Sequence, residues 1–239
     1  MAPVDDMTTE LEALRLLAIS ALLAAMQDSD MSTPSGAWRT LREIFIDITI
    51  VYGEQAAMSA IRYLELDRSL AGVDAPPISL INTVELEQIE RSLGWSLRPL
   101  DEGDLLLAER RMAGALQRLI EQPNRETIFE ATVQANTRYA RVPRPGACAF
   151  CVMLASRGGV YDELTVLLTT GRSTGTSGRS AGLHYHDNCH CTSQEIREGE
   201  ELQPANQRAE KAWEAFSESV RGAVTLGGFE AYLKDHPFE

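Results

Sequence analysis

The residues best suited to chemistry in this 239-residue chain are its cysteines and histidines, which gather in two short stretches. All four cysteines and three of the four histidines lie in "GACAFCVMLASRGG", residues 146–159, and "HYHDNCHC", residues 184–191. Cys148 and Cys151 have C-x-x-C spacing, at which one turn of backbone lets two thiolates face the same metal ion. The second stretch adds H-x-x-C-x-C after a loop long enough to close one site.

These two motifs predict a structural zinc site that leaves no coordination position open for water. The predicted ligands are Cys148, Cys151, His186 and one or both of Cys189 and Cys191. His186 is the preferred histidine because its spacing from Cys189 lets both side chains bind one ion from a single turn. No acidic residue stands at an H-E-x-x-H-like spacing, so the pattern does not indicate a metal-bound water activated by a base.

Three other states of the cysteines stay open. Cys148 and Cys151 could form a redox pair, although the strand-then-helix context of such pairs is missing. Disulfides Cys148–Cys189 or Cys151–Cys191 would need an oxidising compartment, and no secretion signal is visible. All four could also be buried free thiols. Among the remaining histidines, His184 and His190 are expected at strand or turn positions, and His236 at the surface.

Charge is distributed unevenly along the chain, whose net charge is -13 with 44% hydrophobic residues. Residues 1–140 carry 12 basic and 22 acidic side chains, residues 141–199 carry 6 and 5, and residues 200–239 carry 4 and 8. An acidic surface repels phosphate backbones, so strong free-standing nucleic-acid binding is not expected, and protein partners are favoured. No run approaches the roughly 18 uninterrupted apolar residues of a membrane span, so we expect a cytoplasmic protein without a membrane partner.

Apolar periodicity predicts an all-helical region up to about residue 140. Leu11 to Ala25 and Trp38 to Tyr52 repeat apolar residues at spacings of three and four, although "IFIDITIV" is β-branched enough to leave a strand open. The helical pattern continues to about Leu64, and Pro76 and Pro77 then require a loop. Further helical patterns cover residues 84–94, 104–122 and 125–141.

The pattern changes at "VPRPG" and predicts three parts: a helical region over residues 1–140, a zinc-stapled α+β module over 141–199, and a helical tail over 200–239. The fold class is therefore mainly α with a small α+β unit. Helices are expected in "ANQRAEKAWEAFSESVRGAV" and "TLGGFEAYLKDHPFE". Phe229, Tyr232, Leu233 and Phe238 of the tail form an apolar stripe that suits either a partner's groove or this protein's own core.

Residues 138–192 resemble a known family through "RYARVPRPGACAFCVMLASRGGVY" and "YHDNCHC". They are similar to the phage Mu F-type minor head, or head morphogenesis, proteins of tailed bacteriophages, especially the branch found in phages of actinobacteria. The positions that match the family pattern are Arg141, Cys148, Cys151, Ser156, Arg157, Gly158, Tyr161, His186, Cys189 and Cys191. The insert after Tyr161 is longer and more polar than the family's short acidic loop.

The resemblance implies a minor capsid protein that acts near the portal vertex of the phage head during assembly. Its expected partner is the portal protein, with the major capsid or scaffold protein as further candidates and a homo-oligomer around the portal as an expected arrangement. The implied location is the virion, in the head interior or at the portal vertex, after assembly in the host cytoplasm. We expect Arg157, inside the matching motif, to make a fixed bidentate hydrogen bond within the zinc module.

A non-enzymatic role is expected, with two enzyme classes as alternatives. A capsid maturation protease would need Ser156 or Ser180, His184 or His186, and Asp162 or Asp187, but no nucleophile turn frames either serine. A zinc-dependent nuclease of the His-Asn-His kind is suggested by "HYHDNCHC" beside a C-x-x-C pair. The acidic surface and the lack of a second helix with a final ligand weigh against the nuclease.

Overall fold

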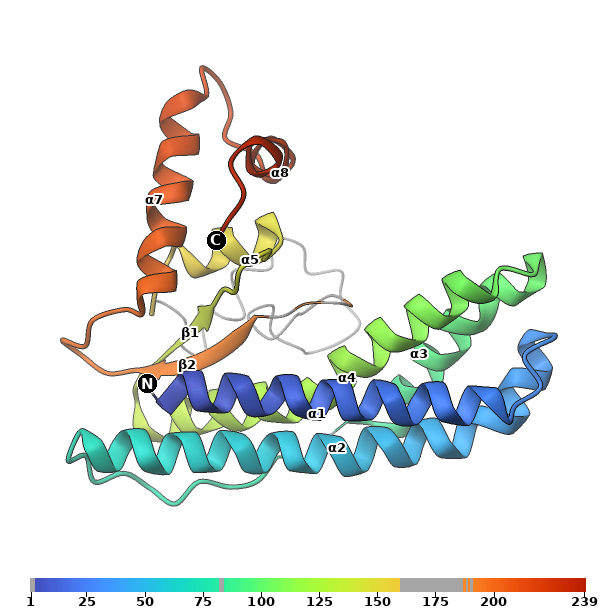
Figure 1. Ribbon diagram of the computed structural model, residues 1–239. Coiled ribbons are helices and arrows are strands. Elements are labelled where there is room, and N and C mark those ends of the chain that lie inside the picture. Colours follow the sequence, from blue (N-terminus) through green and yellow to red (C-terminus); the bar gives the residue numbers. More distant parts are fainter. Residues whose placement is uncertain (1–2, 82–83, 160–186, 188, 190) are drawn as a thin grey trace. The chain divides into compact units, whose positions relative to one another are not determined.

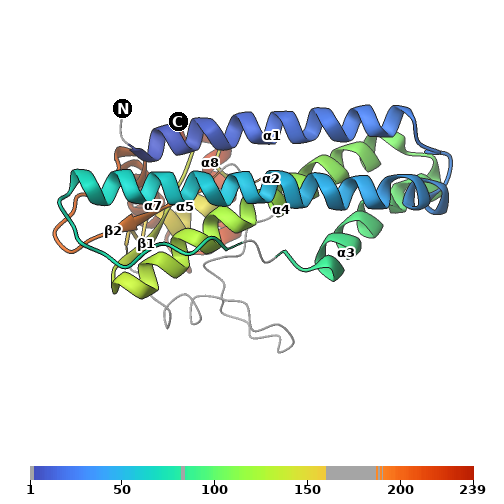
Figure 2. The ribbon, with the colours of Figure 1, turned by 90° about the horizontal axis from the view of Figure 1, so that it is seen from below.

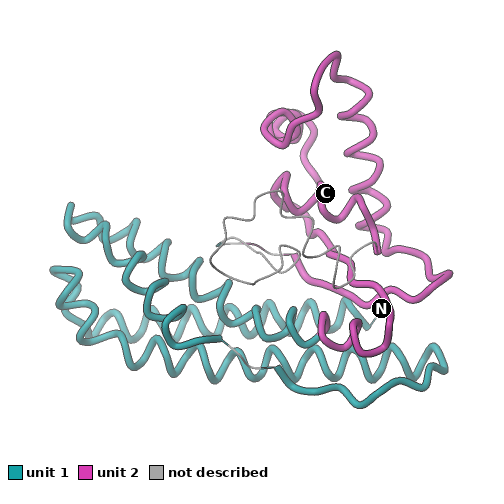
Figure 3. The backbone as a smooth tube through the Cα atoms, turned by 180° about the vertical axis from the view of Figure 1, so that it is seen from behind, with its two compact units in different colours: residues 1–127, 185–188 teal, residues 128–184, 189–239 magenta. Residues whose placement is uncertain are grey.

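The computed structural model describes residues 3–81, 84–159, 187, 189 and 191–239. The chain divides into two compact units (Figure 3). Unit 1 comprises residues 1–127 with 185–188, and unit 2 comprises residues 128–184 with 189–239. The boundary between Thr127 and Ile128 lies inside one helix. The predicted division into residues 1–140, 141–199 and 200–239 stays a prediction.

Unit 1 is built from long helices. Within the described residues these are α1 (Pro3–Gln27), α2 (Pro34–Leu70), α3 (Leu86–Leu97), the short 3-10 helix η1 (Arg98–Glu102) and α4 (Leu105–Ala135). Figure 2 shows α1 and α2 side by side over most of the length of α1. The residues between α2 and α3 that the structure describes are not helical, as the Pro76–Pro77 pair predicts.

Helix α2 settles the ambiguity of the β-branched stretch "IFIDITIV" in favour of helix. It begins with a hydrogen bond from the Gly36 amide to the Thr33 hydroxyl (3.0 Å), followed by a proline in the first turn, where its missing N–H has no helical partner. Phe45 and Ile48 are buried on one face, so tertiary packing overrides the strand propensity of single residues.

One helix among the described residues, α2, is long and apolar enough to cross a membrane by length and composition. Half of its most apolar 18-residue window is buried inside the protein, and core helices pass the same test. The expectation that the protein has no membrane partner stays a prediction.

One apolar cluster in the core of unit 1 receives side chains from every described helix of the unit. Its buried members on α1 and α2 are Ala18, Leu22, Met26, Ala37, Leu41, Phe45, Ile46 and Ile48. Those on α3, η1 and α4 are Ile89, Leu93, Leu97, Leu100, Ala108, Met112, Leu116, Leu119 and Ile120. The recurrence at three and four residues confirms that these stripes form core faces of a helical bundle, except for Ile44 and Val51 of the predicted α2 stripe, which are exposed.

The region before Val142 differs from its predicted helical pattern in one place. Helix α4 runs through Pro123 and ends at Ala135, where Asn136 takes a left-handed conformation with φ 52°. Asparagine tolerates this conformation at helix ends. The next residues, Arg138–Val142, form strand β1. Helix was the wrong prediction for residues 138–141 because their strand partner lies far downstream, beyond the reach of local periodicity.

Unit 2 combines a two-stranded sheet with short helices (Figure 1). Its described elements, after the end of α4, are β1 (Arg138–Val142), α5 (Ala149–Ala155), β2 (Thr192–Ile196), α7 (Pro204–Ser219) and α8 (Leu226–Asp235). The strands are antiparallel, with Val142 opposite Thr192 and Arg138 opposite Ile196. This confirms the predicted class, mainly α with a small α+β unit.

The C-terminal helices pack into the core of unit 2. Helix α5 lies against α7 and α8, and buried Val152 and Ala155 of α5 join Ala209, Phe216 and Phe229 in one apolar cluster. The Trp213 and Phe229 rings meet edge to face, with centroids 4.9 Å apart. Phe229 is 0% exposed and Phe238 is 8% exposed. Of the two uses predicted for the tail's apolar stripe, these two residues therefore serve the core.

Replacing Phe229 with alanine should lower the free energy of unfolding by about 3–5 kcal/mol, because it opens a cavity among packed aromatic rings. The matched control is Leu226→Ala on the same helix. Leu226 is 40% exposed, so its loss should change stability by about 0.5 kcal/mol or less. Urea unfolding followed by tryptophan fluorescence measures both. Equal stability of Phe229→Ala and the unchanged protein would show that α8 does not pack as described.

Candidate metal centre

The sheet brings the two cysteine motifs to one place. In the antiparallel register the end of β1 lies opposite the start of β2, with Val142 facing Thr192. Cys191 directly precedes β2, and the chain leaves β1 toward Cys148 through a short turn in which the Ala147 amide donates to the Arg144 carbonyl (2.9 Å). The C-x-x-C and C-x-C pairs are therefore neighbours because the strands are paired.

Helix α5 positions the first cysteine pair. Cys148 occupies its N-cap position in extended geometry, and Cys151 lies in its first turn. The helix buries Val152 and Ala155 against α7 and α8, which fixes its rotation and places Cys151 on the inner side. After the helix, Gly158 has φ +64°, and a side chain there would meet Leu202 at 2.7 Å. Only glycine fits such a position without strain.

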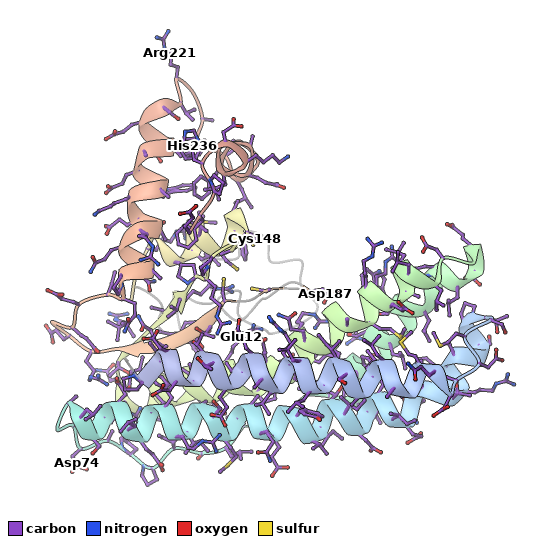
Figure 4. The ribbon with its side chains drawn as sticks, viewed as in Figure 1. Glu12, Asp74, Cys148, Asp187, Arg221 and His236 are labelled. Atoms are coloured by element: carbon purple, nitrogen blue, oxygen red, sulfur yellow. The ribbon has the colours of Figure 1, made fainter. Side chains whose placement is uncertain are left out.

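The thiols of Cys151, Cys189 and Cys191 form a compact buried group. Their Sγ atoms all lie within 4.8 Å of one another, and those of Cys151 and Cys189 are 3.4 Å apart. The three residues are 0%, 4% and 1% exposed. Cys148 is half-buried and hydrogen-bonded to Cys151 (Figure 4 labels it at the start of α5). All four cysteines are free thiols, and the three buried ones can hold a metal ion.

The surroundings disfavour ionised thiols in the metal-free protein. Hydrogen bonds with Cys148, Cys189 and Cys191, together with burial, raise the pKa of the Cys151 thiol well above its usual value. For Cys191, the hydrogen bond with Cys151 lowers the pKa. The contact with Cys189 and burial outweigh it and raise the pKa of Cys191 to about 12. A divalent cation reverses this balance, because a coordinating thiol is deprotonated outright.

Arg141 adds a positive charge to the site. It is 1% exposed, its Nη1 lies 3.5 Å from the Cys151 Sγ, and its guanidinium carbon lies 5.7 Å from the centre of the Phe150 ring. Arg141 matches the family pattern, but the sequence predicts no role for it. The fixed hydrogen bonds within the module were predicted for Arg157. Arg157 is exposed, at the end of α5, so that assignment was wrong. A motif alone does not show which of its arginines faces inward.

Asn206 is a structural residue of the site that sequence reasoning missed. It is 0% exposed, and its side-chain amide donates to the carbonyls of Arg141 (2.6 Å) and Ala155 (3.1 Å). It therefore ties the first turn of α7 to β1 and to the end of α5, which carry Arg141 and Cys151. Its signal in the sequence is weak, because an asparagine after a proline reads as an ordinary helix start.

Several predicted site residues lie outside the described part of the chain: Tyr161, Asp162, Ser180, His184, His186 and His190. Asp187 is described and accepts a hydrogen bond from Arg118 at 2.7 Å, within unit 1. The Ser156 hydroxyl donates to the Met153 carbonyl (2.8 Å). His236 is exposed, as predicted, and stacks on the Tyr232 ring with centroids 4.2 Å apart.

In the metal-free protein, stability should fall as the pH rises from about 9 toward 12. The folded state favours the neutral Cys191 thiol, whose pKa rises from 9.0 to about 12, while the unfolded chain ionises near pH 9. The contribution of the neutral Cys191 thiol to stability is therefore fully present below pH 9 and is lost progressively above it. Urea titrations with a chelator between pH 8 and 10.5 test this. Cys191→Ser should show a shallower decline, and parallel curves for the two proteins would contradict the assignment.

Comparison with known proteins gives the chain its family. The model of the VG15 protein family, which is phage-associated, matches residues 1–219. The match includes both units, with α1 to α7 and all four cysteines, and ends before α8. Searches of curated proteins and of solved structures found no match. Because the family model covers most of the chain, the protein belongs to the VG15 family of phage-associated proteins.

Proposed function

We propose that this protein is a non-enzymatic minor capsid protein that associates with the portal vertex during assembly of a phage head. Two observations support the proposal. The chain belongs to a phage-associated family over residues 1–219. Residues 138–192 also resemble the phage Mu F-type head morphogenesis proteins, and three of the four cysteines of that motif meet in the structure. The motif that carries the resemblance is thus the motif that builds the buried centre of unit 2.

In this proposal the metal is zinc, held by the cysteines as a structural staple. Soft thiolate ligands select zinc or an iron–sulfur cluster over hard cations such as Mg²⁺ or Ca²⁺. The three clustered thiols are nearly inaccessible to solvent, as in structural zinc sites with closed shells. The ion would join the start of α5 to the start of β2. It would supply folding energy to unit 2.

The docking surface is assigned to unit 1. Phe229 and Phe238 of the tail are committed to the core of unit 2, whereas α1 and α2 carry large exposed apolar side chains. On α2, Ile44, Val51 and Met58 follow one another at spacings of seven residues and are 41%, 56% and 36% exposed. This spacing keeps them on one face, as in helix pairs that pack along a seam. The net charge of -13 suits association with a basic or neutral protein face.

The portal protein is the proposed occupant of this face, because the resemblance places the family at the portal vertex. The major capsid and scaffold proteins are the other candidates, and several copies around the portal are the proposed arrangement. The proposed location is the virion, in the head interior or at the portal vertex. The enzyme alternatives predict a different behaviour, namely activity on DNA or peptide in the absence of any partner.

Protein purified without added metal should contain about one equivalent of zinc, and Cys151→Ser should lose most of it because one buried ligand is replaced by a weaker one. Elemental analysis combined with thiol titration measures both. Ser156→Ala is the control, since this residue of the same motif bonds to a backbone carbonyl outside the cysteine group. Free thiols or disulfides with less than about half an equivalent of zinc would rule out the metal assignment.

Co-expression with the portal protein should recover the two proteins together. Ile44→Glu combined with Val51→Glu should lower recovery about tenfold or more, because each change places a charge in the proposed interface. Val224→Glu is the matched control, an exposed apolar residue of unit 2 that is 43% exposed. Equal recovery of all three forms would exclude this face of α2. Cleavage of DNA or peptide by the protein alone would instead favour an enzyme.

A further inference from the structure

Arg141 is a buried cation placed directly against the cysteine group. It is the largest of the described side chains that are almost wholly buried. A guanidinium keeps its proton in proteins, so this residue brings a full positive charge into the interior. Removing such a charge from water costs several kcal/mol unless negative charge lies close to it. The sulfur of Cys151 lies 3.5 Å from Nη1, so a negative charge on this sulfur would lie next to the buried cation.

A neutral thiol supplies no such charge, but a metal-bound thiolate does. Four thiolates around a divalent cation leave a net charge of about -2, whereas three thiolates with a neutral histidine leave about -1. Buried positive charge stabilises the more negative set more strongly. The backbone amide of Arg144 also donates to the sulfur of Cys191, a further positive dipole aimed at the same group. Both contacts strengthen when the sulfur atoms are ionised.

We propose that Arg141 is a positioning residue of a four-thiolate metal site, in which its guanidinium donates to the Cys151 thiolate and offsets the negative charge of the centre. The ligands are Cys148, Cys151, Cys189 and Cys191. This inference rests on the metal centre of the proposed function and specifies its ligands and its electrostatic support. It assigns the fourth position to Cys148, which lies outside the compact group of three thiols but is hydrogen-bonded to Cys151, in place of His186.

The surroundings of Arg141 hold it in this position. The strand pairing sets Arg141 opposite Ser193, two residues after Cys191. Asn206 binds the Arg141 carbonyl, and the Phe150 ring lies within the distance at which cations interact favourably with aromatic faces. The backbone and the guanidinium are thus both fixed before any ion binds. Such support is what keeps metal ligands oriented and strongly bound.

The ligand set can be tested by replacing zinc with Co²⁺ in the full-length protein, because the sulfur-to-cobalt charge-transfer absorption increases with the number of thiolates. We expect the same four-thiolate spectrum in the unchanged protein and in His186→Ala. Cys148→Ser should lose about a quarter of this absorption. The reverse result, a change in His186→Ala and none in Cys148→Ser, would overturn the four-thiolate assignment.

The role of Arg141 can be tested by chelator competition for zinc in three variants. Arg141→Met removes the charge and should weaken zinc binding about 10–100-fold, the range found for groups that support metal ligands. Arg141→Lys keeps a charge without the planar donors and should fall between Met and the unchanged protein. Arg157→Met is the matched control, an exposed arginine of the same motif that should bind zinc as the unchanged protein does.

A second readout separates electrostatic support from a merely structural role. Without the guanidinium the thiolates take up protons more readily, so Arg141→Met should release zinc at a higher pH than the unchanged protein. Lower stability with an unchanged release pH and unchanged zinc affinity would overturn the proposal. If Arg141→Met does not fold, Arg141→Lys decides, and zinc affinity equal to that of the unchanged protein would count against the role. Failure to bind metal overturns the site but leaves portal association to its own test.

Discussion

The pairing of β1 with β2 is the constraint on which unit 2 depends. It closes the long stretch of chain from Val142 to Thr192 and sets both cysteine motifs at the same end of the sheet. Closing such a loop costs conformational entropy, and a two-stranded sheet is marginally stable by itself in water. The pairing must therefore be supported from outside the strands. Asn206, the helices packed on α5 and the cysteine group are the supports that the structure provides.

A metal bound by the cysteines would add to the packing of unit 2 where its two cysteine motifs meet. The apolar cluster described around α5, α7, α8 and the chain end has seven buried residues, and Cys151 lies in the first turn of α5 beside them. Metal binding by thiols contributes directly to the free energy of folding, so a bound ion would stabilise this part of unit 2.

Much of the fold was predictable because it is encoded locally. Helical periodicity in residues 11–25 and 38–64, and the break at Pro76, reflect contacts between residues three and four apart. The cysteine group was predictable from spacing, because C-x-x-C and C-x-C restrict how thiols can face each other. Strand β1 was not predictable in the same way. Its local sequence pattern looks helical, and it forms a strand because β2, about fifty residues later in the chain, pairs with it.

The roles of residues that depend on their burial also could not be predicted from the sequence. Arg141 and Arg157 stand in the same motif, and composition gives no reason to place one inside and the other in solvent. The difference arises because Arg141 lies on a strand covered on both sides, while Arg157 follows the last turn of α5. Asn206 likewise gains its role from two carbonyls that the fold brings to it. Motif membership alone does not tell which of the two arginines is buried.

The burial of the cysteine group bears on what kind of protein this is. A catalytic zinc keeps one coordination position open to water and substrate, so its ligands line an accessible cavity. Here Cys151, Cys189 and Cys191 are each less than 5% exposed, and the buried guanidinium of Arg141 lies 3.5 Å from the Cys151 sulfur. Chemistry at this centre would require the core of unit 2 to open. Such burial fits a structural staple, and under the proposed function the contacts with a partner would lie elsewhere, where α1 and α2 expose large apolar side chains.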